Sequence, residues 1–317
     1  MLTSRLKIAF VGIGSIARRH VKNVLRYLQQ REIPYQIDAI RSGHGIPIPD
    51  DIKAHIKSTY IDSDQIPDDY DIMFITTPTA LHFETIKRYS RSARALFIEK
   101  PVFDRTTIDI QSLLLQSDRY YYVACPLRYT NVVQFIRENV DPRSVFAVRA
   151  ICSSYLPDWR PGLDYRNTYS AKKSLGGGVS IDLIHEMDYL IYLFGFPERM
   201  MCMQSKVSDL EIDSDDFSAY VGRSKETMIE LHLDYFGRHP QRQFELFTKD
   251  DVIVADLLKS EVRFIKNERT ISLPEERNDY QLREIEHFFS IIDGKTINDN
   301  DICMALKTLS IAKGGMA

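Results

Sequence analysis

The pattern of apolar and polar residues changes part-way along the chain. Over the first 124 residues, short apolar runs lie at 8–11, 35–40, 58–61, 71–76, 96–98 and 121–124. Segments with a helical spacing of apolar residues follow several of these runs, and the last such segment predicts a helix over 102–116. This alternation of short strands and helices predicts a parallel, doubly wound sheet.

Beyond residue 125 the predicted strands are longer and alternate between apolar and polar residues. They lie at 145–151, 228–235, 243–248 and 252–257, with helices at 179–194, 280–292 and 301–312. Such alternation is typical of a mostly antiparallel, open sheet with one face solvated or covered by a partner. We therefore expect an α/β protein with a first domain at 1–124 and an α+β domain at 125–317. One option in such a design is that the last helix packs back on the first domain, and the active site is expected in the cleft between the domains.

A glycine turn joins the first predicted strand to the first helix. In the segment LKIAFVGIGSIARRH, Gly12 allows a tight turn and Gly14 allows a pyrophosphate to approach the backbone. Ser15 and Ile16 open the helix, whose N-terminal N–H groups can bind the anion, and Ala17 permits close packing of helix and strand. The segment predicts dinucleotide binding by the first domain, and the alternative is an ordinary strand–helix turn that binds nothing.

Composition narrows the classes of function. The chain has 317 residues, of which 44% are hydrophobic and 27% charged, as in a globular protein with a large core. A net charge of -3 without a basic tract argues against nucleic acid as a partner. The four cysteines form no CxxC pair, so buried, reduced thiols are expected. With no signal peptide and no apolar run of the ~18 residues that span a membrane, the expected location is the cytoplasm.

The end of the second strand bears on the choice of nicotinamide cofactor. An acidic residue there usually binds the ribose 2′-hydroxyl of NAD. Here the strand ends in Arg41 and Ser42, while Asp38 lies inside it. A cation and a hydroxyl suit a 2′-phosphate, which slightly favours NADP over NAD. The alternative is that Arg41 is a surface residue and that either cofactor is accepted.

Glu99, Lys100 and Pro101 follow directly after another predicted strand. Open α/β sheets bind their ligands at the carboxyl ends of the strands. Lys100 is therefore placed to reach a substrate hydroxyl or carboxylate, with Pro101 fixing the backbone. The alternative is a lysine that merely ends a strand.

A second candidate segment is GGGVSIDLIHEMD at residues 176–188. Its glycines allow close approach of a ligand or of another part of the chain. Asp182, His185 and Asp188 are spaced three apart, so on one continuous helix they share a face, where a carboxylate can tune the histidine as a general acid or base. The alternative is a structural histidine. Tyr189 stands where a zinc-protease HExxH motif needs its second histidine, so no metal site is expected.

The segment YLPDWRPGLDYRNTYSAKK at residues 155–173 combines aromatic and basic residues that suit a polar, anionic or sugar-like ligand. It supplies Trp159, Arg166 and Tyr169 as candidate substrate contacts. Tyr169 and Lys173 also form a YxxxK pair, as in short-chain dehydrogenases. We discount that interpretation, because the pair lies beyond the predicted nucleotide domain and the glycine spacing differs.

Together, GIGSIARRH, TTPTALHFE, EKP and GGGVSIDLIHEMD resemble the glucose–fructose oxidoreductase / inositol dehydrogenase (Gfo/Idh/MocA) family in order and separation. The segment at 156–178 is similar to a branch associated with surface-sugar biosynthesis. The resemblance implies that Lys100 positions the substrate, His185 exchanges a proton and Asp182 is its acidic partner. One departure is that many members place the acid four residues before the histidine, whereas here the gap is three.

The resemblance also implies further ligand contacts. It places Arg128 and Asp188 near the substrate. The expected cofactor-binding residues after the second strand are Thr77, Pro78, His82, Glu99, Lys100 and Pro101.

The resulting hypothesis is an NAD(P)-dependent dehydrogenase that acts on a secondary alcohol or ketone of a sugar, nucleotide sugar or cyclitol. The alternatives are a non-catalytic NAD(P)-binding sensor and a reductase of a non-sugar substrate on the same fold. A homodimer or homotetramer is expected, because the open sheet leaves a face to be covered.

Overall fold

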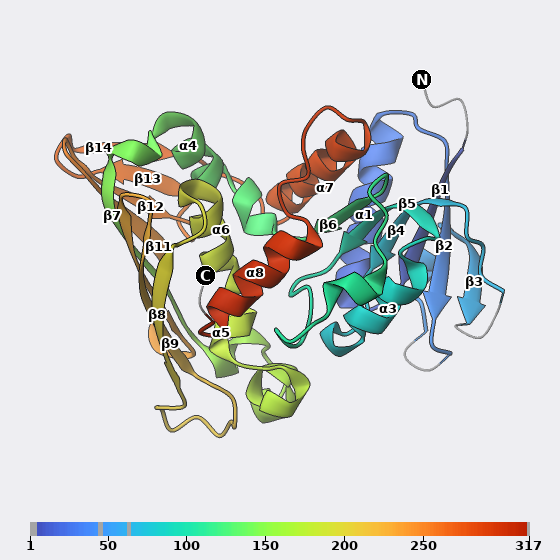
Figure 1. The fold of residues 1–317 in the computed structure, drawn as a ribbon, viewed down its shortest axis with the longest axis horizontal. Helices are drawn as coiled ribbons and strands as arrows, with labels where there is room; N and C mark the ends of the chain where they lie inside the picture. Colours follow the sequence, from blue (N-terminus) through green and yellow to red (C-terminus); the bar gives the residue numbers. More distant parts are fainter. Residues whose placement is uncertain (1–4, 44–46, 62–64, 316–317) are drawn as a thin grey trace. The chain divides into compact units, whose positions relative to one another are not determined.

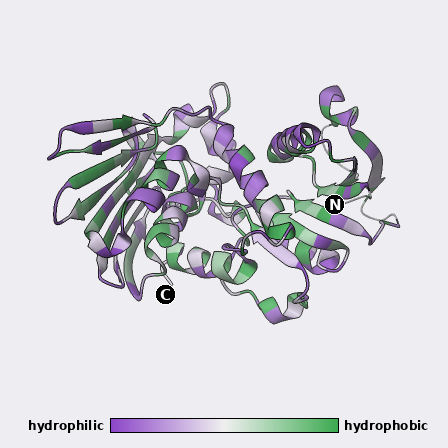
Figure 2. Cartoon of the chain, turned by 90° about the horizontal axis from the view of Figure 1, so that it is seen from above, coloured by the Kyte–Doolittle hydropathy of each residue, from purple (hydrophilic) through white to green (hydrophobic). Residues whose placement is uncertain are grey.

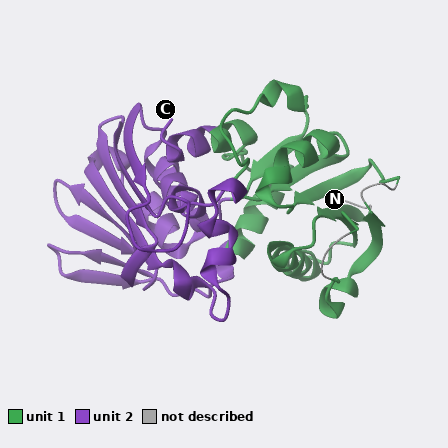
Figure 3. Ribbon diagram, turned by 90° about the horizontal axis from the view of Figure 1, so that it is seen from below, with its two compact units in different colours: residues 1–124, 281–306 green, residues 125–280, 307–317 purple. Residues whose placement is uncertain are grey.

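The computed structural model describes residues 5–43, 47–61 and 65–315. The chain divides into two compact units (Figure 3). Unit 1 comprises residues 1–124 and 281–306, and unit 2 comprises residues 125–280 and 307–317. Residues 281–306, which the sequence analysis placed in the second domain, thus belong to unit 1.

Unit 1 is built on a six-stranded sheet in the order β3-β2-β1-β4-β5-β6, and every neighbouring pair is parallel (Figure 1). This confirms the predicted doubly wound sheet. The strands are β1 (Leu6–Val11), β2 (Tyr35–Arg41), β3 (Ile56–Ile61), β4 (Tyr70–Ile75), β5 (Ala93–Ile98) and β6 (Tyr120–Val123). The strand order reverses between β1 and β4, so their carboxyl ends form the switch point at which such sheets bind ligands.

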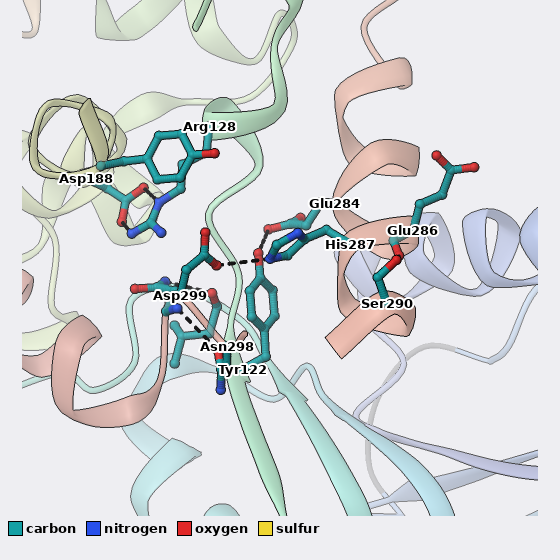
Figure 4. Close-up of polar contacts among 12 residues, drawn as sticks. Tyr122, Arg128, Asp188, Glu284, Glu286, His287, Ser290, Asn298 and Asp299 are labelled. Atoms are coloured by element: carbon teal, nitrogen blue, oxygen red, sulfur yellow. Dashed lines mark hydrogen bonds and ion pairs between the residues drawn. The ribbon is translucent and has the colours of Figure 1, made fainter. Parts of the chain in front are cut away.

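Helices from both ends of the chain cover this sheet. They are α1 (Ser15–Gln30), the short α2 (Asp50–Lys53), α3 (His82–Tyr89) and α7 (Asp279–Ile292). Tyr27 of α1 stacks on Phe289 of α7 with ring centroids 4.2 Å apart. The hydroxyl of Tyr122 in β6 donates to Glu284 Oε1 of α7 at 3.3 Å (Figure 4). These contacts explain why residues 281–306 belong to unit 1, although they are distant in sequence from residues 1–124.

The predicted helix at 102–116 is wrong. The structure has only a single 3₁₀ turn, Ile110–Leu113, in this segment. Asp109 caps the turn by accepting from the N–H of Gln111 at 3.0 Å, and Leu114 ends it in the left-handed region at φ 50°. Thr106, Thr107 and Ile108, just before this turn, are β-branched residues with low helix propensity, which disfavours a helix in this part of the segment.

Unit 2 is built on an eight-stranded sheet in the order β14-β13-β12-β11-β7-β10-β9-β8 (Figure 1). Its strands are β7 (Val145–Tyr155), β8 (Arg199–Ser205), β9 (Phe217–Ser224), β10 (Thr227–Asp234), β11 (Phe236–Thr248), β12 (Val252–Asp256), β13 (Glu261–Phe264) and β14 (Arg269–Ser272). Only β7 and β10 pair in parallel, which confirms the mostly antiparallel sheet. The sequence analysis missed β8, β9, β13 and β14.

The helices of unit 2 pack on one face of this sheet and form its core. They are α4 (Asn131–Asn139), α5 (Val179–Asp182) and α6 (Ile184–Phe194). The last helix of the chain, α8 (Ile302–Ala312), begins in unit 1 and ends in unit 2. Val133 of α4 and Leu190 of α6 share a buried cluster with Val148, Leu231 and Phe244 of the sheet. Along the strands, hydrophobic and hydrophilic residues alternate (Figure 2), so one face is buried and the other is left uncovered by these helices. No helix within the described ranges has the length and apolar character needed to cross a bilayer.

Candidate functional site

The turn after β1 requires glycine at position 12. Gly12 has φ +86°, and a Cβ on it would lie 3.1 Å from the backbone of Thr76 and Thr77. The Thr76 hydroxyl donates to the carbonyl of Gly12 at 2.6 Å. The turn is therefore packed against the end of β4, at the switch point of the sheet.

Gly14, by contrast, borders open space. It is the exposed N-cap of α1, and no heavy atom of the described chain lies within 4 Å of where its Cβ would be. No side chain caps this helix end, so the N–H groups of the first turn, including those of Ser15 and Ile16, are available to an anion. Gly12, Gly14 and the start of α1 therefore fit the pyrophosphate of a dinucleotide.

The end of β2 places Arg41 and Ser42 after the buried part of the strand, with Arg41 half-buried and Ser42 exposed. Asp38 is 1% exposed and accepts hydrogen bonds from the N–H of Ser58 at 3.2 Å and the hydroxyl of Tyr70 at 3.1 Å. The Asp38 carboxylate is thus hydrogen-bonded to other strands of the sheet. Arg41 and Ser42 are the polar residues at the end of β2.

Glu99 lies directly beneath the turn that carries Lys100. Its carboxylate forms a buried ion-pair contact with Nε2 of His20 from α1, and its second oxygen accepts from the N–H of Lys100 at 3.2 Å. Burial acts to raise the pKa of Glu99, but the hydrogen bond and charge of His20 and the charge of Lys100 outweigh it and hold that pKa below its usual value. Glu99 therefore links the glycine-turn helix to Lys100. Glu99 was predicted from the sequence as a cofactor contact, whereas its partner His20 was not predicted.

His82, also expected among the cofactor contacts, is 1% exposed and links two turns. Its Nε2 lies 3.0 Å from the carbonyl oxygen of Thr77, and its Nδ1 lies 3.1 Å from that of Pro101. Burial lowers the pKa of His82. Thr77 itself is half-buried and Pro78 exposed, so His82 supports the Thr77–Pro78 turn and the Lys100–Pro101 turn from below.

In unit 2, the predicted continuous helix over 179–194 is interrupted. α5 ends at Asp182, Leu183 leaves the helical region with ψ 28°, and α6 begins at Ile184. Asp182 and His185 therefore lie on two different helices, so the prediction of one continuous helix is wrong. The break at Leu183 lies between Asp182 and His185. These two residues are three positions apart here, whereas the acid and the histidine are four positions apart in many members of the family that the sequence resembles.

The Asp182 carboxylate accepts a hydrogen bond from a tyrosine. The hydroxyl of Tyr235, which follows β10, donates to Asp182 Oδ2 at 2.5 Å. Burial and the negative charge of Asp182 raise the pKa of Tyr169. His185 is half-buried at the start of α6. Tyr235 was missed from the sequence, because no local pattern connects it to Asp182.

The glycines before α5 accommodate the chain itself. A Cβ on Gly177 would lie 2.1 Å from the carbonyl oxygen of Tyr169, and one on Gly178 would lie 2.2 Å from Asp215 Oδ1. The second oxygen of Asp215 accepts from the N–H of Ser180 at 3.0 Å. The missing side chain at Gly177 thus lets the Tyr169 segment lie next to the start of α5, and the missing side chain at Gly178 lets Asp215 do so.

Arg128 and Asp188 form a buried, two-pronged ion pair (Figure 4). Nε and Nη2 of Arg128 lie 2.8 and 2.7 Å from the two carboxylate oxygens. The side chains are only 3% and 10% exposed. The structure thus brings together two residues that the sequence analysis assigned separately to substrate binding.

The other predicted substrate residues lie along the segment at 155–173. Trp159 is half-buried and donates from Nε1 to the hydroxyl of Ser154 at 3.0 Å, and it borders a shallow pocket with Arg160. Arg166 is exposed and forms ion pairs with Asp164 and Glu211. Trp159 therefore lies in a hollow of the segment, whereas Arg166 is held among surface carboxylates.

Residues 6–118 match the model of the GFO_IDH_MocA oxidoreductase family, described as having an NAD-binding Rossmann fold. This part of the chain is therefore similar to that family. The match begins at β1 and includes the glycine turn, the Thr77–Pro78 turn and Glu99–Lys100–Pro101.

Relatives of the Gfo/Idh/MocA type are distant in sequence. An uncharacterized oxidoreductase, YrbE, of Bacillus subtilis is 27% identical over 207 residues, which are 61% of this chain and 55% of the relative. An inositol 2-dehydrogenase of Rhizobium meliloti is 25% identical over 200 residues, which are 60% of this chain and 55% of the relative. The chain thus spans about half the length of these curated relatives.

A solved structure extends the likeness in fold to the whole chain. Levoglucosan dehydrogenase in complex with NADH and levoglucosan superposes with a TM-score of 0.78 at 16% identity, covering 98% of this chain and 96% of that one. At this identity the likeness shows the fold alone. It confirms the predicted fold, with a parallel sheet and a second, mostly antiparallel sheet.

Proposed function

We propose that the protein transfers a hydride between a nicotinamide dinucleotide and a carbon that carries a hydroxyl or keto group. The observation that carries this proposal is the open glycine turn at Gly12 and Gly14, at the switch point of a parallel sheet in which the nearby strand β5 leads into the turn that bears Lys100. The family match of residues 6–118 to an NAD-binding oxidoreductase fold supports it.

The proposed reaction assigns a role to each candidate residue. The start of α1 would hold the pyrophosphate, and Thr77, Pro78 and Pro101 would border the nicotinamide and its ribose. The cofactor, when bound, supplies the acceptor or donor of the hydride. Lys100 hydrogen-bonds the reacting oxygen, and His185 exchanges its proton.

The proposed substrate is a sugar, a nucleotide sugar of the kind used in surface polysaccharides, or a cyclitol. The names of the relatives, an inositol dehydrogenase and a levoglucosan dehydrogenase, support this class. Trp159, Tyr169, Arg166, Arg128 and Asp188 are the proposed substrate residues. Of these, the exposed ring of Tyr169 and the hollow at Trp159 offer direct contact, whereas the buried Arg128–Asp188 pair would shape the site from below.

Titration with NADH and with NADPH, followed by nicotinamide fluorescence, tests the cofactor proposal. We expect NADPH to bind more tightly, because Arg41 and Ser42 end β2 where a 2′-phosphate would lie. Arg41→Ala should then weaken NADPH binding about tenfold, as loss of a charged hydrogen bond does, and leave NADH binding unchanged. Arg26→Ala, on the exposed side of α1, is the control.

Equal binding of the two dinucleotides would contradict the preference for NADP and leave the dehydrogenase proposal in place. If neither dinucleotide bound, the interpretation of Gly12 and Gly14 would be wrong, and the oxidoreductase proposal would fail with it.

We further propose that the protein forms a homodimer or homotetramer through the uncovered face of its second sheet. Met201, Met203, Val221 and Met228 lie exposed on β8, β9 and β10, with exposures of 72%, 69%, 41% and 44%. Apolar residues on adjacent strands favour a self-complementary contact about a two-fold axis. Light scattering should give twice or four times the mass of 36.8 kDa, and Met201→Asp should shift the protein toward the monomer. A wild-type monomer at assay concentration would contradict this proposal.

A further inference from the structure

His20 lies in the second turn of α1, on the buried side of the helix that begins after Gly14. Its side chain is only 2% exposed. The ring lies edge-on to Phe97 of β5, with centroids 5.0 Å apart, and beside Phe74 of β4, with centroids 6.0 Å apart. An imidazole is thus buried against aromatic rings of two strands, where a polar side chain is costly unless it is hydrogen-bonded.

The hydrogen bond of His20 is made to Glu99. His20 donates from Nε2 to Oε1 of Glu99, whereas its Nδ1 is buried and has no hydrogen-bond partner within the described residues. The Glu99 side chain is itself only 12% exposed. Its other oxygen, Oε2, accepts from the backbone N–H of Lys100 at 3.2 Å. One carboxylate therefore joins the side chain of His20 to the backbone of the residue proposed to bind the reacting oxygen.

Stability alone does not account for a buried pair of this kind. Taking a carboxylate and an imidazole out of water costs free energy, and well-packed apolar residues often stabilise a protein equally well or better. What the pair adds is direction, because a charge-assisted hydrogen bond fixes the geometry of both partners. The backbone of Glu99 is held as well, since its N–H donates to the carbonyl of Ile75 at the end of β4 at 3.0 Å. Glu99 is thus held from two sides.

We propose that His20 is a positioning residue for Lys100, on which it acts through the carboxylate of Glu99. The ring of His20 sets the direction of the carboxylate, and the carboxylate fixes the N–H of Lys100 and so the turn from which the ammonium extends. Such positioning matters because a small displacement of a group that acts on the reacting oxygen lowers turnover. The inference rests on the proposed dehydrogenase role of Lys100, but the positioning itself can be measured without turnover.

Hydrogen–deuterium exchange of the Lys100 amide, followed by mass spectrometry on overlapping peptides of the full-length protein, tests the positioning. Pro101 has no N–H, which helps to assign the exchange to Lys100. His20→Phe keeps an aromatic ring but removes the hydrogen bond to Glu99. We expect the Lys100 amide to exchange about tenfold faster in this variant, because the acceptor of its N–H is no longer fixed. His20→Gln should restore much of the protection, since a glutamine amide can donate to the carboxylate.

His287 supplies a matched control. Its Nε2 lies 3.0 Å from Oδ1 of Asp299, so His287→Phe also breaks a histidine–carboxylate pair of unit 1 (Figure 4). His287 belongs to α7 and not to α1. Exchange at Lys100 should therefore stay within about twofold of the wild type in His287→Phe, because any local opening occurs elsewhere. Thermal unfolding of each variant separates such local changes from a loss of global stability.

Turnover on a substrate found by assaying sugars, nucleotide sugars and cyclitols tests whether the positioning serves the reaction. His20→Phe should lower kcat about 10–100-fold and leave KM and the dissociation constant of the dinucleotide within about threefold. In the Lys100→Met background the same change should lower kcat by no more than about twofold, because a residue that acts through the ammonium has no further effect once the ammonium is gone. A merely structural role would give equal losses in both backgrounds.

Unchanged exchange at Lys100 in His20→Phe would overturn the inference, as would an equal rise in His287→Phe. Equal losses of kcat with and without Lys100 would assign His20 to folding and not to positioning. Failure of the dehydrogenase proposal is distinguishable, because it would appear as a wild type that neither binds a dinucleotide nor turns over a substrate, while the exchange of the Lys100 amide would still decide whether His20 positions it.

Discussion

Replacing Lys100 by methionine should lower turnover by about 10²–10⁴-fold, the range for loss of a group that assists proton transfer. This corresponds to about 3–5 kcal/mol of transition-state stabilisation. Methionine keeps most of the length and apolar character of the lysine stem but removes the ammonium that would hydrogen-bond the reacting oxygen. The backbone N–H of Lys100, which donates to Glu99, is kept by the substitution.

Affinity for the dinucleotide should stay within about threefold of the wild type, because the start of α1 and not Lys100 would hold the pyrophosphate. The measurement combines steady-state kinetics, on a substrate found by assaying sugars, nucleotide sugars and cyclitols, with the titration by NADH and NADPH described above. Lys87→Met, at an exposed position of α3, is the control. Near-normal turnover by Lys100→Met would show that Lys100 is not catalytic, and a parallel loss of cofactor binding would assign it to the dinucleotide site instead.

The parts of unit 1 that the sequence predicted well depend on local patterns. Gly12 must adopt a positive φ directly after a buried strand, and the helix that follows must start there, so the motif and its structure occupy the same few residues. The positions of Arg41 and of Lys100 at strand ends follow in the same way from where the apolar runs stop. Each of these inferences needs only neighbours in sequence.

The parts that sequence reasoning missed depend on contacts between distant residues. His20 and Glu99 are 79 positions apart, and Tyr235 and Asp182 are 53 positions apart. No spacing rule relates such pairs, because their proximity is created by packing of α1 on the sheet and of α5 near β10. The break at Leu183 was missed for a related reason, since the apolar spacing of 179–194 is that of a single helix and tertiary contacts decide where it is interrupted.

Removing Asp188 should destabilise unit 2 by about 3–5 kcal/mol, because Asp188→Ala leaves the guanidinium of Arg128 buried without its carboxylate. Both side chains are almost fully buried, so water cannot replace the lost partner. The ring of Tyr192, whose centroid is 4.9 Å from the guanidinium carbon, offsets only part of this charge. Urea unfolding followed by Trp159 fluorescence reports on unit 2 directly.

The chain contains a matched control for burial. Arg143 and Asp141 form the same kind of two-pronged pair, but the Arg143 side chain is 88% exposed. Asp141→Ala should therefore cost about 1 kcal/mol or less. A loss of that size for Asp188→Ala as well would show that Arg128 finds another solvated or paired arrangement.

The double variant Arg128→Met/Asp188→Leu separates stability from function. It removes both charges together and replaces them with apolar groups of similar size, so most of the stability lost in Asp188→Ala should return. In this folded variant the proposed substrate role of the pair can be measured without interference from unfolding. If the variant binds myo-inositol, levoglucosan and UDP-N-acetylglucosamine as the wild type does, the pair is purely structural, because ligand binding then depends on neither charge. Weakened binding in a stable protein would instead require that Arg128 or Asp188 shapes the substrate site.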